Sequence, residues 1–146
     1  MENKFIRQLE IRWSDLDPNF HVLHSKYYDF GAYCRTCFLV ENGMTPAFMA
    51  ANKIGPILFR EEALFKKELS FGDELSVSLE VIKCTEDMSR WSMRHELFKN
   101  KTTLAAIITI DGAWINTIDR KLAVPPVTLQ HIFEAAPRSK DFLIIE

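Results

Sequence analysis

Four titratable side chains lie within a ten-residue segment, residues 15–24, and make it the part of the chain where chemistry is easiest to place. They are Asp15, Asp17, His21 and His24. Carboxylates and imidazoles are the usual bases, nucleophiles and metal ligands at neutral pH. A helix is predicted from Ser25 onward, so the segment brings these groups to a helix N-terminus, where backbone N–H groups are unpaired. A turn at residues 17–19 followed by helix capping explains the same residues without any chemistry.

Metal-based and phosphate-based chemistry fit this segment less well. His21 and His24 lie three residues apart beside carboxylates, but a catalytic metal site usually needs further ligands from elsewhere in the chain. The other histidines, His95 and His131, have no carboxylate cluster around them in the sequence. An aspartyl-phosphate enzyme also uses an Asp-x-Asp, but places it at the end of a parallel, apolar strand, whereas the strand predicted here alternates in polarity.

Acyl-thioester chemistry fits the segment more directly. A thioester carbonyl needs a nucleophile or general base, and hydrogen-bond donors for the oxyanion that develops on it. Asp17 supplies a carboxylate, and the N-terminus of the following helix supplies N–H groups and a favourable dipole. A thioester is activated enough for these two devices to suffice, so we expect neither a metal nor a bound cofactor.

The segment resembles the opening motif of the 4-hydroxybenzoyl-CoA thioesterase-like family, which are hot-dog-fold acyl-CoA thioesterases. The resemblance is carried by Arg12-Trp13-Ser14-Asp15-Leu16-Asp17, His21-Val22, His24, Tyr27 and Arg35, with a weaker match at Phe71-Gly72-Asp73-Glu74-Leu75. It extends over residues 5–120. It implies a curved antiparallel sheet wrapped around one long helix, and active sites that lie between paired subunits.

The resemblance also implies roles for individual residues. Asp17 takes the position of the catalytic carboxylate, as nucleophile or general base, and the backbone N–H near His24 holds the thioester oxygen. We expect His21, Ser25 and Tyr27 to contact the substrate, in which coenzyme A enters only as part of the acyl-CoA. Phe20 is a departure, because many members of the family have glycine there, and a bulky side chain does not readily adopt a positive φ. A re-aimed loop or a narrowed pocket is therefore expected.

Several extended segments and one long helix must position these residues. Polarity alternates over residues 5–13, 75–81 and 91–97, which predicts half-buried strands. Residues 104–110 are almost continuously apolar, as in a strand covered on both faces, and residues 57–67 are predicted to be extended. Short helices are predicted at 46–52 and 129–133.

The long helix is predicted over residues 25–41. Apolar residues occupy nearly its whole circumference, which predicts a helix buried on all sides. Ser25 is expected to cap its start and Gly43 to suit its exit. Cys34 and Cys37 form a Cys-x-x-Cys in the middle of this apolar block, where core thiols are favoured over a redox pair.

Composition limits the class of protein. The chain has 146 residues, 47% of them hydrophobic and 26% charged, and a net charge of −2. These values predict a single globular α+β domain over residues 1–146 and disfavour nucleic-acid binding. No apolar run is long enough for a membrane span, and three cysteines without an export signal predict a cytoplasmic protein. Edge strands that need protection, together with the resemblance, predict a homodimer or homotetramer.

An acyl-CoA thioesterase is therefore the function predicted from the sequence. Two alternatives stay open. A hot-dog hydratase acting on enoyl thioesters also uses an Asp and a His a few residues apart, although residues 17–21 lack the order of that motif. A non-catalytic acyl-thioester-binding protein with the same fold is favoured by Phe20.

Overall fold

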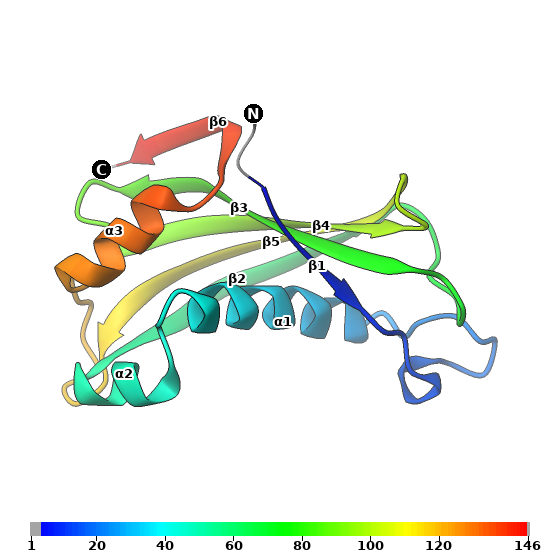
Figure 1. The fold of residues 1–146 in the computed structure, drawn as a ribbon, viewed down its shortest axis with the longest axis horizontal. Helices are drawn as coiled ribbons and strands as arrows, with labels where there is room; N and C mark the ends of the chain where they lie inside the picture. Colours follow the sequence, from blue (N-terminus) through cyan, green and yellow to red (C-terminus); the bar gives the residue numbers. More distant parts are fainter. Residues whose placement is uncertain (1–3, 146) are drawn as a thin grey trace.

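A curved sheet of six strands lies over one long helix, α1, and two shorter helices flank the C-terminal end of α1 (Figure 1). The computed structural model describes residues 4–145. The elements in chain order are β1 (Phe5–Leu9), the 3-10 helix η1 (Trp13–Asp15), α1 (Lys26–Glu41), α2 (Pro46–Ala51), β2 (Ile54–Phe65), β3 (Leu75–Thr85), β4 (Arg90–Lys99), β5 (Thr103–Asn116), α3 (Val127–Ala135) and β6 (Arg138–Ile145). The predicted α+β class, with a curved antiparallel sheet packed on a central helix, is confirmed.

The strands follow the order β1-β3-β4-β5-β2, and every pairing along this path is antiparallel. β6 pairs in parallel with the second half of β3, beyond the part of β3 that pairs with β1. β2 therefore ends the order on one side, and both β1 and β6 lie along β3 on the other. None of the helices in the described part of the chain is long and apolar enough to cross a membrane.

The alternating strands bury one row of side chains each, as predicted. On β3 the buried row is Leu75, Val77, Leu79 and Val81, and on β4 it is Trp91, Met93, His95 and Leu97. These rows face α1 and form the core together with the buried positions of the helix. His95 is the polar member of a buried row, and its surroundings bear on the pocket described below.

The prediction that residues 104–110 are covered on both faces is wrong. In β5, Ala106, Ile108 and Ile110 are fully buried, whereas Ile107 and Thr109 between them are only half-buried. Within residues 4–145 the helices lie on one face of the sheet, so Ile107 and Thr109 on the other face are covered only in part. The apolar run in the sequence therefore reflects β-branched residues on both faces of β5, and only one of these faces is fully buried.

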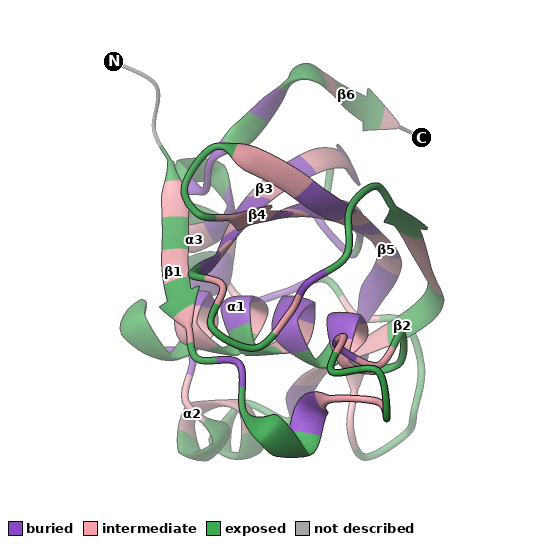
Figure 2. Ribbon diagram, turned by 90° about the vertical axis from the view of Figure 1, so that its right-hand side faces the viewer, coloured by how far each residue is buried: buried purple, intermediate pink, exposed green. Residues whose placement is uncertain are grey.

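The prediction that the long helix is buried all round is also wrong. Its buried residues are Tyr27, Phe30, Gly31, Cys34 and Phe38, and they lie on the side that faces the sheet (Figure 2). Tyr33 and Val40 are exposed on the opposite side. A single sheet covers only one side of a helix, so Tyr33 and Val40 are left on the surface while Tyr28 and Leu39 are partly buried at the edge of the core.

Gly31 is a position of close approach between α1 and β4. A Cβ built there would lie 3.1 Å from Cδ2 of His95, so glycine leaves the space that the imidazole occupies. The helix ends before Gly43, which has the positive φ of 89° expected of an exit glycine.

The Cys34 thiol lies 3.5 Å from the carbonyl oxygen of Val77, and burial raises its pKa to about 12. Its neighbour Cys37 is a half-buried free thiol. A thiol with so high a pKa is not a redox nucleophile, which supports the core interpretation of this pair.

The first strand is shorter than predicted. β1 ends at Leu9 and the chain then turns into η1, which leaves Trp13 exposed instead of extending the apolar row. The residues between β1 and α1 form a loop at the end of the molecule where α1 begins (Figure 1).

Candidate active site

Asp15 anchors the loop between β1 and α1. It is 1% exposed, and its carboxylate accepts the backbone N–H of Arg12 at 2.9 Å. The Arg12 guanidinium lies 3.6 Å from the other carboxylate oxygen, and the Asp15 carbonyl accepts the N–H of Leu23. These bonds tie the start of the loop to its end, so Asp15 has the structural role that its position at the 3-10 turn suggests.

Asp17 lies at the base of a tight turn formed by residues 17–21. One of its carboxylate oxygens, Oδ1, accepts the backbone N–H groups of Asn19 at 2.8 Å and of His21 at 3.1 Å. The backbone N–H of Asp17 donates to the His21 carbonyl at 2.8 Å, which closes the turn. The side chain is half-buried, and its Oδ2 has no hydrogen-bond partner among residues 4–145. One oxygen therefore holds the loop in shape while the other is free to act.

Phe20 adopts the backbone conformation that usually requires glycine. Its φ is +64°, and its N–H donates to the Asp17 carbonyl at 3.0 Å. The expectation that a bulky residue would re-aim the loop is therefore wrong. The hydrogen bonds of the turn hold the backbone in the left-handed region, and the side chain, 71% exposed, has no neighbour to avoid. The strain of a non-glycine residue in this region is stored in the loop.

His21 connects the loop to the segment that follows β2. It forms an isolated antiparallel bridge with Ser70, and its Nε2 lies 3.1 Å from the Glu68 carboxylate. The neighbouring N–H of Val22 donates to the Leu69 carbonyl at 2.8 Å. His21 is thus engaged with Glu68, whereas Asp17 contacts only its backbone.

The backbone N–H groups of His24 and Ser25 have no hydrogen-bond acceptor in the described part of the chain. Both residues are exposed and lie just before the first turn of α1. Ser25 occupies the N-cap position, but its own φ and ψ are helical and its side chain makes no capping hydrogen bond, so the predicted cap is wrong. An uncapped helix start leaves N–H donors for a ligand.

A depression of about 260 Å³ lies at the start of α1. It is lined by Val22, His24, Tyr27, Phe65, Lys66, Lys67 and Glu68. Tyr27 packs edge-on against Phe65 with ring centroids 5.0 Å apart, and burial raises the pKa of its hydroxyl. The structure thus places His24 and Tyr27 in one depression, while Asp17 and His21 lie in the preceding loop.

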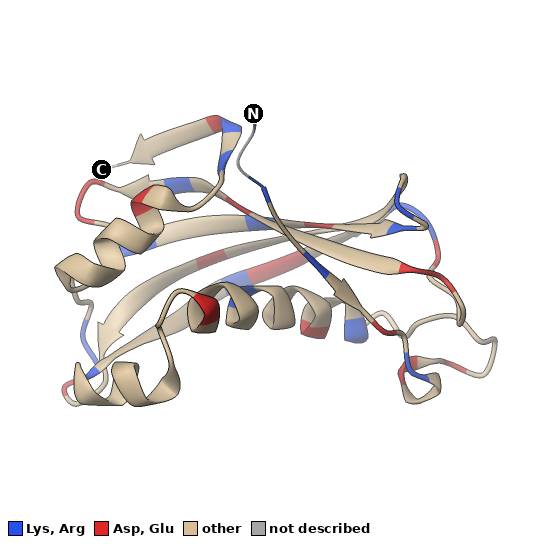
Figure 3. Cartoon of the chain, in the orientation of Figure 1, with Lys and Arg blue, Asp and Glu red and all other residues tan. Residues whose placement is uncertain are grey.

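In the sequence, Lys66 and Lys67 are two of several basic residues that could meet the phosphates of coenzyme A, but a solvated surface position explains them equally simply. The pair directly follows β2, and its two backbone N–H groups both donate to the Ala105 carbonyl, so β5 fixes the pair beside the helix start. Figure 3 shows both acidic and basic residues at this end of the molecule, as at the opposite end. The signal in the sequence is a Lys-Lys pair at the end of the predicted extended segment 57–67, and only the sheet pairing gives the pair a position.

Within residues 4–145 no three His, Cys, Asp or Glu side chains form a group that could hold a metal ion. His21 and His24 therefore do not meet Asp15 and Asp17 in a ligand cluster. The depression at the helix start brings His24, beside the unpaired N–H donors, together with Lys66 and Lys67. Asp17, which has one unpartnered carboxylate oxygen within residues 4–145, lies in the preceding loop and does not line the depression.

The sequence matches the model of the thioesterase-like superfamily over residues 11–133. This match covers most of the chain, and the chain belongs to that superfamily. The expected class, acyl-CoA thioesterase, is confirmed at this level. No curated protein matches the sequence significantly.

Solved structures with the hot-dog thioesterase fold superpose closely on this chain. A protein from Staphylococcus aureus solved in complex with CoA gives a TM-score of 0.83 at 19% identity, over 96% of this chain and 90% of that one. A 1,4-dihydroxy-2-naphthoyl-CoA thioesterase from Synechocystis gives 0.80 at 16% identity, over 91% and 97% of the two chains. A thioesterase from Thermus thermophilus, complexed with coenzyme A and zinc, gives 0.74 at 19% identity, over 89% and 91%. At these identities the likeness establishes the fold.

Proposed function

We propose that this protein hydrolyses an acyl-CoA to the free acid and coenzyme A at the start of α1. The free Oδ2 of Asp17 attacks the thioester carbonyl or activates water, and the N–H groups of His24 and Ser25 stabilise the oxyanion. The observation that carries the proposal is the uncapped start of α1, whose exposed N–H groups have no acceptor within residues 4–145. His24 and Tyr27 border the substrate, and His21 holds the loop through Glu68.

The lysine pair supports coenzyme A as the leaving group. Lys66 and Lys67 lie beside His24 on the rim of the same depression, where they can neutralise the phosphates of the coenzyme. Solved structures of this fold include complexes with CoA, which agrees with this assignment.

A panel of acyl-CoAs with a thiol-trapping dye tests the proposal. Release of free thiol that depends on the protein supports hydrolysis. Loss of enoyl absorbance without free thiol would indicate a hydratase, and binding without turnover would indicate a non-catalytic protein. The positive φ of Phe20 weakens the case for a non-catalytic protein, because the turn has the backbone conformation typical of glycine although the residue is phenylalanine.

We also propose that two copies pair along β2 into a C2 dimer. β2 runs for twelve residues and ends the strand order, with Leu58, Phe59, Leu64 and Phe65 exposed along it. A long apolar edge is normally paired or covered. Light scattering at micromolar concentration should give twice the mass of the 16.9 kDa chain, and a monomer would contradict the proposal.

A further inference from the structure

Glu68 is the acidic residue, among residues 4–145, that lines the depression at the start of α1. Its backbone is held in place from two sides. The Glu68 carbonyl accepts Nζ of Lys99 at 2.7 Å, and the carbonyl of the next residue, Leu69, accepts the N–H of Val22 at 2.8 Å. The Glu68 side chain therefore projects from a fixed position into the depression that also contains His24.

The Glu68 carboxylate is engaged at one of its two oxygens. Oε2 lies 3.1 Å from Nε2 of His21, whereas Oε1 has no hydrogen-bond partner in the described part of the chain. No lysine or arginine within residues 4–145 forms an ion pair with this carboxylate, and the side chain is 73% exposed, so water can reach Oε1. Burial raises the pKa of the Tyr27 hydroxyl, and the negative charge of Glu68 raises it further, which agrees with a carboxylate close to that wall of the depression.

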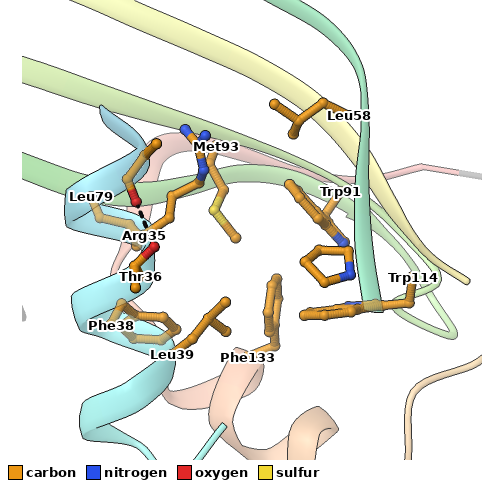
Figure 4. Close-up of a pocket in the computed structure, with 12 residues that line it drawn as sticks. Arg35, Thr36, Phe38, Leu39, Leu58, Leu79, Trp91, Met93, Trp114 and Phe133 are labelled. Atoms are coloured by element: carbon orange, nitrogen blue, oxygen red, sulfur yellow. Dashed lines mark hydrogen bonds between the residues drawn. The ribbon is translucent and has the colours of Figure 1, made fainter. Parts of the chain in front are cut away.

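A cavity of about 170 Å³ lies farther along α1, between the helix and the sheet (Figure 4). One of its walls is aromatic, with Trp91, Trp114 and Phe133 in mutual contact at centroid distances of 5.9, 6.1 and 5.6 Å. Arg35 lines the cavity from the helix, and no carboxylate or imidazole is among the described residues that line it. The cavity therefore offers no base that could activate water.

Glu61, another carboxylate close to α1, is already engaged. Its Oε2 lies 3.7 Å from Nη2 of Arg35, whose Nη1 donates to Nε2 of His95 at 3.1 Å. His95 in turn donates from Nδ1 to the Ser78 carbonyl at 2.9 Å, as the neutral tautomer requires. Glu61 thus balances the charge of a fixed guanidinium, whereas Glu68 has a free oxygen at the depression.

Asp17 and Glu68 flank the same residue, His21. Oδ1 of Asp17 accepts the backbone N–H of His21 at 3.1 Å, and Glu68 lies against its imidazole. A carboxylate that attacks a thioester becomes part of an acyl anhydride, so it can no longer take a proton from water. Release of the acyl group from Asp17 therefore needs a second base. An anhydride is a more activated acyl donor than a thioester, so an ordinary carboxylate suffices.

We infer that Glu68 is this second base, which activates the water that releases the acyl group. The inference rests on the proposed function, with Asp17 as its nucleophile. In the first step Oδ2 of Asp17 bonds to the acyl carbon, the C–S bond breaks, and coenzyme A leaves as the thiolate. In the second step a water oxygen bonds to the same carbon, its proton passes to Oε1 of Glu68, and the bond to Oδ2 breaks. The Asp17 carboxylate is regenerated, and Glu68 passes the proton to solvent.

Glu68→Gln tests the second step, because it keeps an oxygen that can face the His21 ring but removes the base. The probe is the acyl-CoA of the panel that the wild-type protein hydrolyses fastest, mixed rapidly with the protein and the thiol-trapping dye. The variant should release about one thiol per subunit in a fast phase. Its steady rate should then be about 10²-fold below that of the wild type. The thermal unfolding midpoint should not change, since an exposed ion pair contributes little to stability.

Glu74→Gln is the matched control. Glu74 is exposed in the same segment of the chain and does not line the depression, so this variant should show the wild-type time course. Hydroxylamine then identifies the slow step. It is a stronger nucleophile than water and needs no base, so it should raise the steady rate of Glu68→Gln at least about tenfold and give the hydroxamate. The reaction of hydroxylamine with the thioester in the absence of protein is subtracted.

A steady rate in Glu68→Gln within about twofold of the wild type would overturn the inference and leave the proposed function standing. Slow turnover without a fast release of thiol, or without rescue by hydroxylamine, would also overturn it, because acyl transfer rather than acyl release would then be impaired. If the wild-type protein releases no thiol from any acyl-CoA of the panel, the proposed function itself fails, and the inference fails with it.

Discussion

The two ends of α1 offer hydrogen-bond donors in opposite ways. At the N-terminal end the donors are backbone N–H groups of His24 and Ser25, which are exposed and free because no side chain caps the helix. At the other end they are the side chains of Trp91, Trp114 and Arg35, which are buried in an aromatic cavity. The first set can be reached by a ligand, whereas the indole N–H groups of the second set have almost no accessible surface.

The two ends of α1 also differ in electrostatic environment: the titratable groups at the cavity end are buried, and those at the loop end are more accessible. At the cavity, burial lowers the pKa of His95 to about 3 and also lowers the pKa of Arg35. A neutral imidazole accepts from the guanidinium at every physiological pH, so this end is a fixed arrangement. At the loop, Asp17 is half-buried and one of its oxygens is unpartnered within residues 4–145. The comparison teaches that the groups a ligand can reach lie at the helix start, whereas the groups at the cavity end are held fixed within the core.

The largest expected effect is at Asp17. Asp17→Asn keeps an oxygen that can accept the N–H groups of Asn19 and His21, so the turn should survive while the nucleophile or base is lost. Hydrolysis should fall by about 10²-fold or more, with an unchanged thermal unfolding midpoint.

Asp15→Asn is the matched control. Asp15 is buried and bonded to the Arg12 N–H, so this change should act mainly on stability and lower the unfolding free energy by about 1 kcal/mol. A folded Asp17→Asn protein with near-normal turnover would show that the loop end is not where the reaction occurs.

The second-largest effect distinguishes the role of the His24 backbone N–H from the role of its imidazole side chain. His24→Asn keeps the backbone N–H and should therefore retain activity within roughly tenfold. A tenfold change in rate corresponds to about 1.4 kcal/mol in the activation barrier. His24→Pro deletes the N–H and should lose far more. Circular dichroism must show that the proline variant is folded. If His24→Asn abolishes turnover as fully as Asp17→Asn does, the imidazole itself is the acid or base, and the backbone model fails.

The third prediction concerns the pH dependence of stability at the cavity end. Unfolding raises the pKa of His95 from about 3 to its ordinary value near 6.5, so the unfolded chain binds more protons between these pH values. The contribution of His95 to stability is therefore present above pH 6.5 and is lost as the pH falls, by up to about 1.4 kcal/mol per pH unit.

His95→Gln should flatten the dependence of the unfolding free energy on pH over this range, measured by urea unfolding at a series of pH values. His131→Gln, at an exposed position, should leave the slope unchanged. Equal slopes in the two variants would mean that the cavity end is no more sensitive to protons than the surface.

The smallest effect is at Phe20. Phe20→Gly removes the strain of a positive φ without losing buried contacts, and should raise the unfolding free energy by about 1 kcal/mol while leaving hydrolysis within twofold. Phe20→Ala removes the same ring but keeps the strain, so it should give no such gain. A large loss of activity in both variants would instead assign the exposed ring to substrate binding.

The sequence shows which residues the loop brings to the start of α1, because these residues are neighbours in the chain, and their roles stay predictions. The spacing of Asp17, His21 and His24 and the start of a helix directly after them were all visible as a local pattern. The elements themselves were also predictable, since the alternation over residues 75–81 and 91–97 is set by which side chains can enter the core. Where the predictions failed, at Ser25, at Phe20 and on the outer face of α1, the outcome depended on backbone angles and neighbours that no local pattern specifies.

Local sequence therefore determined the strands, the long helix and the motif that the helix start presents, because hydrogen bonding within the chain and burial of one face act over a few residues. Only the tertiary structure decided the cavity, whose lining comes from α1, β2, β3, β4, β5 and α3. Arg35 and His95 are sixty residues apart, and they meet because α1 packs across β4 where Gly31 leaves room for the imidazole. Contacts of this kind are set by how close one element can approach another, and the spacing of residues along the chain carries no record of that distance.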